Sequence, residues 1–116
     1  MSETTDERVL EIVRALISQT KQGRISWTPT DDQEAFLYSS RSSSIIVDTN
    51  RRKLPQPYWI RILNERGAEV GRLHAAGGDA ARPDLAELHE LARRSALRID
   101  EVLDNVLRDL QDPPPF

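Results

Sequence analysis

The two histidines of this chain are the residues best suited to acid–base or metal chemistry. His74 closes a stretch in which apolar and polar residues alternate, and His89 lies in a stretch with helical periodicity. Glu87 and Glu90 are close to His89 in sequence, but residues one and two positions apart point to different sides of a helix. The spacing therefore supplies no second metal ligand, and we expect both histidines to be surface or strand-edge residues.

The other residue types that perform chemistry also lack their usual partners. The serines of residues 39–44 do not belong to a Gly-x-Ser-x-Gly elbow, and Gly77-Gly78 is not followed by the Lys-Ser/Thr of a phosphate loop. Asp100 and Glu101 open a helix, where negative charge offsets the helix dipole without any catalytic role. The absence of cysteine excludes thiol catalysis and thiolate zinc sites. The sequence predicts no catalytic residue, no metal site and no bound cofactor.

A basic loop is the strongest candidate for ligand binding. Residues 49–57 contain three consecutive cations and two prolines, and the prolines prevent regular structure. If the turn at residues 39–44 lies beside this loop, cations hold phosphates while Tyr58 or Trp59 stacks on a base. The cations of this nucleic-acid or nucleotide hypothesis are Arg41, Arg51, Arg52 and Lys53. We favour the alternative, a solvated loop that keeps an edge strand from pairing with other molecules.

Charge is distributed unevenly along the chain. The formal net charge of −3 argues against nonspecific nucleic-acid binding by the whole surface. Residues 1–23 carry −1, residues 24–74 carry +2 and residues 75–116 carry −4, so an anion site is expected in the middle segment. The first seven residues are acidic where a secretory signal is basic, and no apolar run approaches the roughly 20 residues of a spanning helix. We therefore expect a cytoplasmic protein without a membrane segment.

Helical periodicity marks the N-terminal segment and predicts a helix over about residues 5–22. Thr4 and Glu7 form a capping-box pattern, and Gly23 supplies the left-handed residue that commonly closes a helix. The apolar stripe of this helix consists of Val9, Ile12, Val13, Leu16 and Ile17.

The middle of the chain has the period of two that is typical of strands. Pro29 ends the first strand because it removes a backbone donor, and Asn64-Glu65-Arg66-Gly67 forms the turn between the last two. The strands are expected at about residues 24–28, 35–38, 45–47, 58–63 and 69–74.

Trp27 and Trp59 are expected in the core because aromatic residues of strands usually face the covering helices. A second register remains open, in which Tyr58, Ile60 and Ile62 face inward. Trp59, Arg61 and Leu63 then form an exposed stripe, which would mark a partner surface. The residues that we expect to be buried are Leu16, Ile60, Ile62, Leu88 and Leu103.

Helical periodicity returns after Pro83, which suits the first turn of a helix, and continues to Leu110. One continuous helix would be roughly 40 Å long, which exceeds the roughly 35 Å diameter of a compact domain of this size. We therefore predict a break near residues 97–99, with Asp100 as the cap of the second piece. Apolar side chains spread over more than one narrow face of that piece, and the residues expected to form a homodimer interface are Val102, Val106 and Leu110.

Together these elements predict an α+β fold. A curled antiparallel meander of about five strands is flanked by the N-terminal helix and the C-terminal helices, which cover its apolar face. We expect one domain over residues 1–111 and a proline-rich tail over residues 112–116.

The leading helix, the Gly23-Arg24-Ile25-Ser26-Trp27 strand, the hairpin that starts at Tyr58 and the leucine-rich end resemble a recurring type of small bacterial protein from high-GC genomes or phage. The resemblance spans about residues 10–110 and implies an accessory or adaptor-like domain. As function we favour a non-enzymatic protein–protein interaction module with a protein partner and self-association. Binding of nucleic acid or a nucleotide through the basic loop is the alternative.

Overall fold

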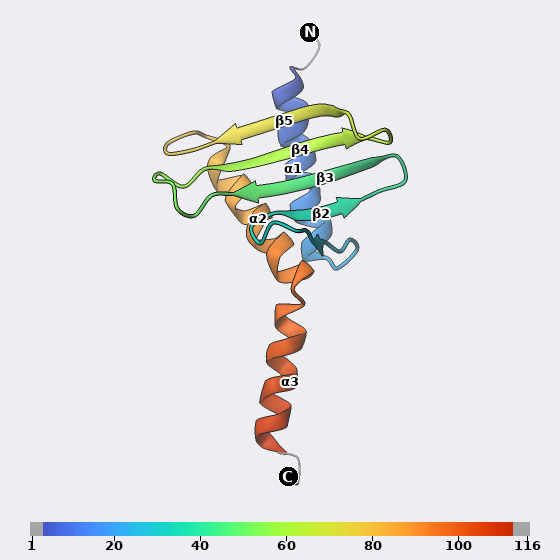
Figure 1. Cartoon of the computed structure of the whole chain (residues 1–116), viewed down its shortest axis with the longest axis vertical. Helices are drawn as coiled ribbons and strands as arrows, with labels where there is room; N and C mark the ends of the chain where they lie inside the picture. The colour runs from blue at the N-terminus through green and yellow to red at the C-terminus, as the bar shows by residue number, and fades with distance from the viewer. Residues whose placement is uncertain (1–3, 113–116) are drawn as a thin grey trace.

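Five strands pair antiparallel in chain order and form an open sheet, β1-β2-β3-β4-β5, which is not closed into a barrel. The structure is a computed structural model, in which residues 4–112 are described. Figure 1 shows the strands side by side, with α1 and α2 behind them and α3 below. The expected α+β class and meander are confirmed. The elements are α1 (Thr5–Lys21), β1 (Thr28–Pro29), β2 (Phe36–Ser39), β3 (Ser43–Thr49), β4 (Tyr58–Asn64), β5 (Glu69–Ala75), α2 (Arg82–Ala96) and α3 (Ile99–Gln111).

Helix α1 begins and ends where its signals predict. The backbone N–H of Glu7 donates to Thr4 Oγ1 at 3.1 Å, and Gly23 takes a φ of +71° just beyond the helix. The apolar stripe of α1 lies against the sheet, and α1 approaches β5 closely at Gly71. A Cβ at Gly71 would meet Val9 Cγ2 at 3.2 Å, so a glycine at this position allows the helix its close approach.

The three long strands set the register of the sheet. Val47 of β3 pairs with Ile60 of β4, and Ile60 pairs with Leu73 of β5, so these side chains share one face. The β4–β5 hairpin closes through Gly67, whose N–H donates to the carbonyl of Asn64 at 2.9 Å with a φ of +81°. The predicted hairpin turn is confirmed.

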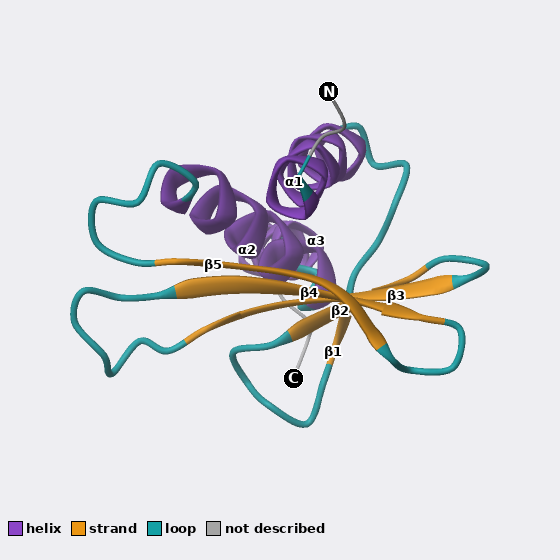
Figure 2. Ribbon diagram, turned by 90° about the horizontal axis from the view of Figure 1, so that it is seen from above, coloured by secondary structure: helices purple, strands orange, loops and turns teal. Residues whose placement is uncertain are grey.

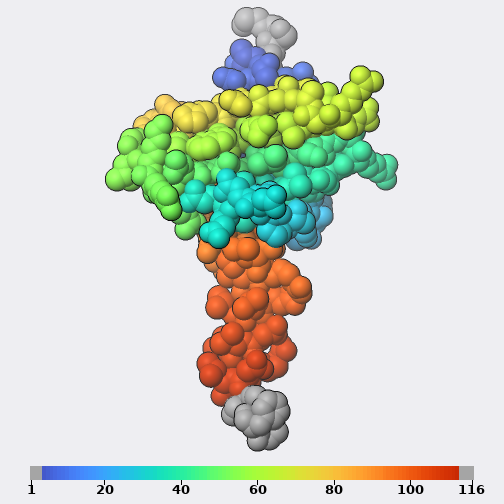
Figure 3. All heavy atoms as spheres, in the orientation of Figure 1, coloured from blue at the N-terminus to red at the C-terminus, as the bar shows by residue number. Residues whose placement is uncertain are grey.

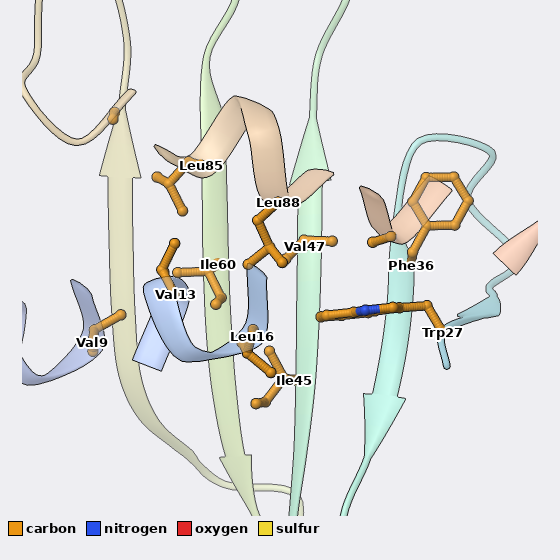
Figure 4. Packing of buried hydrophobic residues seen from close by; sticks show 12 residues of the cluster. Val9, Val13, Leu16, Trp27, Phe36, Ile45, Val47, Ile60, Leu85 and Leu88 are labelled. Carbon is orange, nitrogen blue, oxygen red and sulfur yellow. The ribbon is translucent and has the colours of Figure 1, made fainter. Parts of the chain in front are cut away.

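The core lies between this face of the sheet and two helices. Figure 2 shows α1 and α2 together on one side of the strands, and Figure 4 shows Val13 and Leu16 of α1 next to Ile60 and Ile45. Ile60 and Leu88 are fully buried and Leu16 nearly so, as expected, while Ile62 is half-buried at the edge of the cluster. The buried apolar cluster comprises Val9, Val13, Leu16, Trp27, Phe36, Ile45, Val47, Ile60, Ala75, Leu85, Leu88 and Ala92.

The first strand differs from its prediction. Residues 24–27 are not paired in the sheet, and β1 contains only Thr28 and Pro29, although Pro29 was expected to end it. The physical reason lies in Trp27, whose backbone N–H donates to Ser95 Oγ of α2 at 2.9 Å instead of to a strand. The indole of Trp27 is buried as predicted, and its Nε1–H donates to Thr20 Oγ1 at 3.0 Å.

The predicted break between the C-terminal helices is present at Arg98. This residue takes a left-handed backbone conformation with a φ of +53°, and its position redirects the chain between α2 and α3. The expected cap is wrong, because Arg98 occupies the N-cap position and Asp100 instead forms an ion pair with Arg94.

Helix α3 does not cover the sheet, contrary to the expectation for the C-terminal helices. Among the elements of residues 4–112 it contacts α2 alone, and it extends the molecule to 65 Å along its longest axis (Figure 3). Leu103 is 54% exposed, so its expected burial is wrong. The length argument predicted a break correctly but assumed that the second piece folds back onto the body. Of the expected tail, residues 112–116, all but Asp112 lie outside the described residues.

Candidate functional site

The side of the sheet that carries no helix forms the first candidate surface, which we call the open face. Pairing places Leu37 opposite Ile46, Ile46 opposite Arg61, and Arg61 opposite Arg72. Alternation along each strand adds further residues to the same side. The open face consists of Thr28, Leu37, Ser39, Ser44, Ile46, Asp48, Trp59, Arg61, Leu63, Glu69, Arg72 and His74.

Four apolar side chains of the open face remain partly accessible. Leu37, Ile46, Trp59 and Leu63 are half-buried. Trp59 was expected in the core, and that expectation is wrong: Tyr58, Ile60 and Ile62 pack inward, which is the second register left open by the sequence. The inward position beside His89 is occupied by Tyr58, whose ring centroid lies 5.7 Å from the imidazole centroid.

Charge on the open face is organised by one carboxylate. Arg61 and Arg72 are directly paired across β4 and β5, which places like charges side by side. Glu69 Oε1 accepts hydrogen bonds from Arg61 Nε at 3.0 Å and from Arg72 Nε at 3.1 Å. The hydrogen bond from Arg61 is the main cause that lowers the pKa of Glu69. One carboxylate thus bridges two guanidinium groups, and this half of the face keeps an excess positive charge.

The basic loop does not join Arg41, contrary to the hypothesis of one four-cation site. Arg41 lies before β3 begins at Ser43, whereas Arg51, Arg52 and Lys53 follow its end at Thr49. Because β3 has seven residues at about 3.3 Å each, the two turns lie at opposite ends of the sheet (Figure 1). All four cations are exposed, and Arg51 Nε lies 4.0 Å from Glu34 Oε1.

Two hollows meet at Trp59, at the end of the open face nearest the basic loop. One, of about 300 Å³, is lined by Asn50, Lys53, Pro57, Trp59, Arg72 and His74. The other, of about 690 Å³, is lined mainly by carboxylates and amides, including Asp31, Asp32, Glu34 and Asp48, together with Arg52. Burial is the largest cause that raises the pKa of Asp48. A cationic hollow therefore adjoins an acidic one, with an indole between them.

His89 is buried, so its expected surface position is wrong. It lies one helical turn beyond Leu85 on the inward face of α2, and its Nε2 donates to the carbonyl oxygen of Glu34 at 2.7 Å. The burial of His89 could have been predicted from the sequence, because positions 85, 88, 89 and 92 form one helical stripe. Within residues 4–112 no group of three or more histidines and carboxylates is placed to hold a metal ion.

Helix α3 forms the second candidate surface, and it contains the three residues expected at a dimer interface. Every residue from Asp100 to Gln111 is exposed, including Val106 at 47% and Leu110 at 73%. Helical spacing gathers the apolar side chains into one stripe of about four-tenths of the circumference. The α3 stripe consists of Ile99, Val102, Leu103, Val106, Leu107 and Leu110. No described helix is both long enough and apolar enough to span a membrane.

No protein-family model, curated protein or solved structure matches this chain. Functional inference therefore begins from the open face, the two hollows and the α3 stripe.

Proposed function

We propose that this protein is a non-enzymatic interaction module and that α3 is its main contact helix. One observation carries the proposal: α3 projects from the body as an amphipathic helix whose apolar side chains from Val102 to Leu110 are all exposed. Exposed apolar patches of this extent are typical of partner surfaces, because leaving them in water forgoes about 25 cal/mol for each Å² that could be buried.

The break at Arg98 supports the same proposal. A non-glycine residue in the left-handed region is uncommon and carries a conformational cost. The ion pair of Arg94 with Asp100 spans the break, and Arg98 itself pairs with Glu101, and both contacts favour the bend. The bend thus orients α3 away from α2 and leaves the stripe free for a partner.

Paired aspartates on the stripe test the proposal. Val106→Asp with Leu110→Asp should leave the thermal melt close to that of the parent, since neither side chain is buried in the body. The same variant should abolish self-association in light scattering and retention of any cellular protein on the immobilised chain. Arg108→Asp is the matched control, because it lies on the opposite side of α3 and changes the net charge by the same two units.

The outcome that contradicts the proposal is a parent with neither self-association nor a retained protein that depends on the stripe. Loss of folding in the double variant would equally contradict it, since it would mean that the stripe belongs to the core of the molecule.

A nucleotide-derived ligand is the second candidate, and the cationic hollow favours it. Lys53, Arg72 and His74 line that hollow beside Trp59, which supplies a stacking surface. The adjoining carboxylates oppose phosphate binding, which is why this candidate ranks second. Quenching of the tryptophan fluorescence of the chain by a short single-stranded oligonucleotide tests it, and the quenching should be weakened by salt and by Arg51→Ser, Arg52→Ser and Lys53→Ser together. Absence of quenching by the parent at low salt eliminates it.

A further inference from the structure

The open face and the α3 stripe are two partly or fully exposed apolar surfaces of one chain, and neither covers the other. The α3 stripe contacts no strand, since α3 contacts α2 alone among the described elements. On the open face, Leu37, Ile46, Trp59 and Leu63 lie on the side of the sheet opposite to α1 and α2. Each surface is therefore an apolar surface without a cover within its own chain, and each could cover the other in a second copy.

We infer that α3 of one copy packs across the open face of a second copy, and that the two copies do so reciprocally. This inference rests on the proposed function of α3, and it identifies a second copy of the chain as the partner that α3 contacts. Reciprocal docking is an isologous two-fold arrangement, in which the same two surfaces meet twice and no apolar surface remains for a third copy.

The dimensions of the two surfaces agree. Thirteen residues make α3 about 20 Å long. Five strands at about 4.8 Å spacing make the sheet about 19 Å wide across the strands. Helix α1 crosses the strands in this way on the covered side (Figure 1), so the sheet already carries one helix in this orientation. A second helix on the open face would complete a helix–sheet–helix sandwich.

The charge of α3 is complementary to the part of the open face that contains Arg61 and Arg72. Helix α3 contains Asp100, Glu101, Asp104 and Asp109 but only one cation, Arg108, so its formal charge is −3. Helical spacing places Asp100 on one border of the stripe and Asp109 on the other. On the β4–β5 half of the open face, Arg61 and Arg72 share only one carboxylate, whereas Asp48 and the acidic hollow lie at the end near Trp59. The carboxylates that border the α3 stripe are therefore expected over Arg61 and Arg72, away from Asp48.

Reciprocity also favours the open face over direct pairing of two α3 helices. In a parallel pair, the two α3 axes would lie about 8–10 Å apart. The two bodies would then clash, because the molecule measures 35 and 26 Å along its two shorter axes. In an antiparallel pair the bodies stay apart, but both open faces remain in water. Docking of α3 on the open face covers both kinds of apolar surface at two contacts, so it buries more area.

Cysteine trapping separates these arrangements, because the chain has no cysteine of its own. Val106→Cys and Ile46→Cys are prepared as separate proteins, one with an affinity tag, and are mixed under mild oxidation at micromolar concentration. We expect the mixed disulfide as the main product. Arg108→Cys mixed with Ile46→Cys is the matched control and should give at least tenfold less mixed product, because Arg108 points away from the stripe. Leu63→Cys replaces Ile46→Cys if that variant melts early.

Three outcomes overturn the inference. A mixed disulfide no more abundant than that of the Arg108→Cys control shows that the stripe does not meet the open face. Efficient Val106→Cys homodisulfide without the mixed product assigns the dimer to paired α3 helices and leaves the proposed function standing. A parent that is monomeric in light scattering at roughly 100 micromolar, a concentration on the order of that used for trapping, also overturns it. If stripe-dependent retention of another protein is then absent as well, the proposed function fails too.

Discussion

His89 of α2 donates a hydrogen bond of 2.7 Å from Nε2 to the backbone carbonyl oxygen of Glu34, which precedes β2. A carbonyl oxygen only accepts, so the proton of the neutral imidazole is on Nε2. The ring lies between Phe36 and Tyr58, with centroid distances of 5.4 and 5.7 Å. This hydrogen bond connects α2 to the β1–β2 loop, and so it holds one wall of the acidic hollow in place.

The first prediction follows from the burial of His89, which lowers its pKa below the ordinary value of 6.5. Below pH 6.5 the unfolded chain binds this proton more strongly than the folded chain, so stability falls as the pH decreases from about 6.5 toward the folded pKa. His89→Gln should flatten this dependence between pH 7.5 and 5 in urea denaturation. His74→Gln, at the other histidine, should preserve it. An unchanged pH dependence in His89→Gln would contradict the assignment.

The second prediction separates the two faces of the sheet. Ile60→Ala should lower the free energy of unfolding by about 2–5 kcal/mol, because Ile60 is fully buried between β4 and the helices. Ile46→Ala removes the same atoms from the open face, where the side chain is only half-buried, and should cost less than half as much. Urea denaturation of the dilute protein measures both. Equal losses would refute the register.

The third prediction concerns the polar connection beneath α1. Thr20 Oγ1 accepts from Trp27 Nε1 at 3.0 Å and donates to the carbonyl of Leu16 at 2.7 Å. Thr20→Val keeps the shape but leaves the indole N–H without its acceptor, which should cost about 1–3 kcal/mol. Thr28→Val, whose hydroxyl is exposed at the short β1, serves as the control and should change stability by about 0.5 kcal/mol or less. Equal effects would show that the hydrogen bond between Trp27 and Thr20 contributes nothing to stability.

Local signals predicted much of the fold. The Thr4 cap, the Gly23 and Gly67 turns and the position of Pro83 each depend on the conformations of a few neighbouring residues, and each is present in the structure. Alternation and helical periodicity likewise predicted the helices and the four longer strands, because burial on one face imposes a period on the chain itself.

Placement of the candidate surfaces depended on contacts between distant residues. Arg41 and the basic loop have similar sequence character, but their separation follows from the direction and length of β3. Trp59 and Tyr58 are adjacent aromatic residues, and only the packing of α2 against one face of the sheet decided that Tyr58 lies inward beside His89.

The sequence by itself determined that the last helix has an apolar stripe and that a break precedes it, since both are properties of neighbouring residues. Whether that stripe lies on the sheet or in water was decided only by the tertiary structure. The left-handed conformation of Arg98 directs α3 away from a body whose inward face α1 and α2 already fill. Periodicity reports which side of a helix is apolar, whereas the occupant of that side is set by the space that the rest of the chain leaves free.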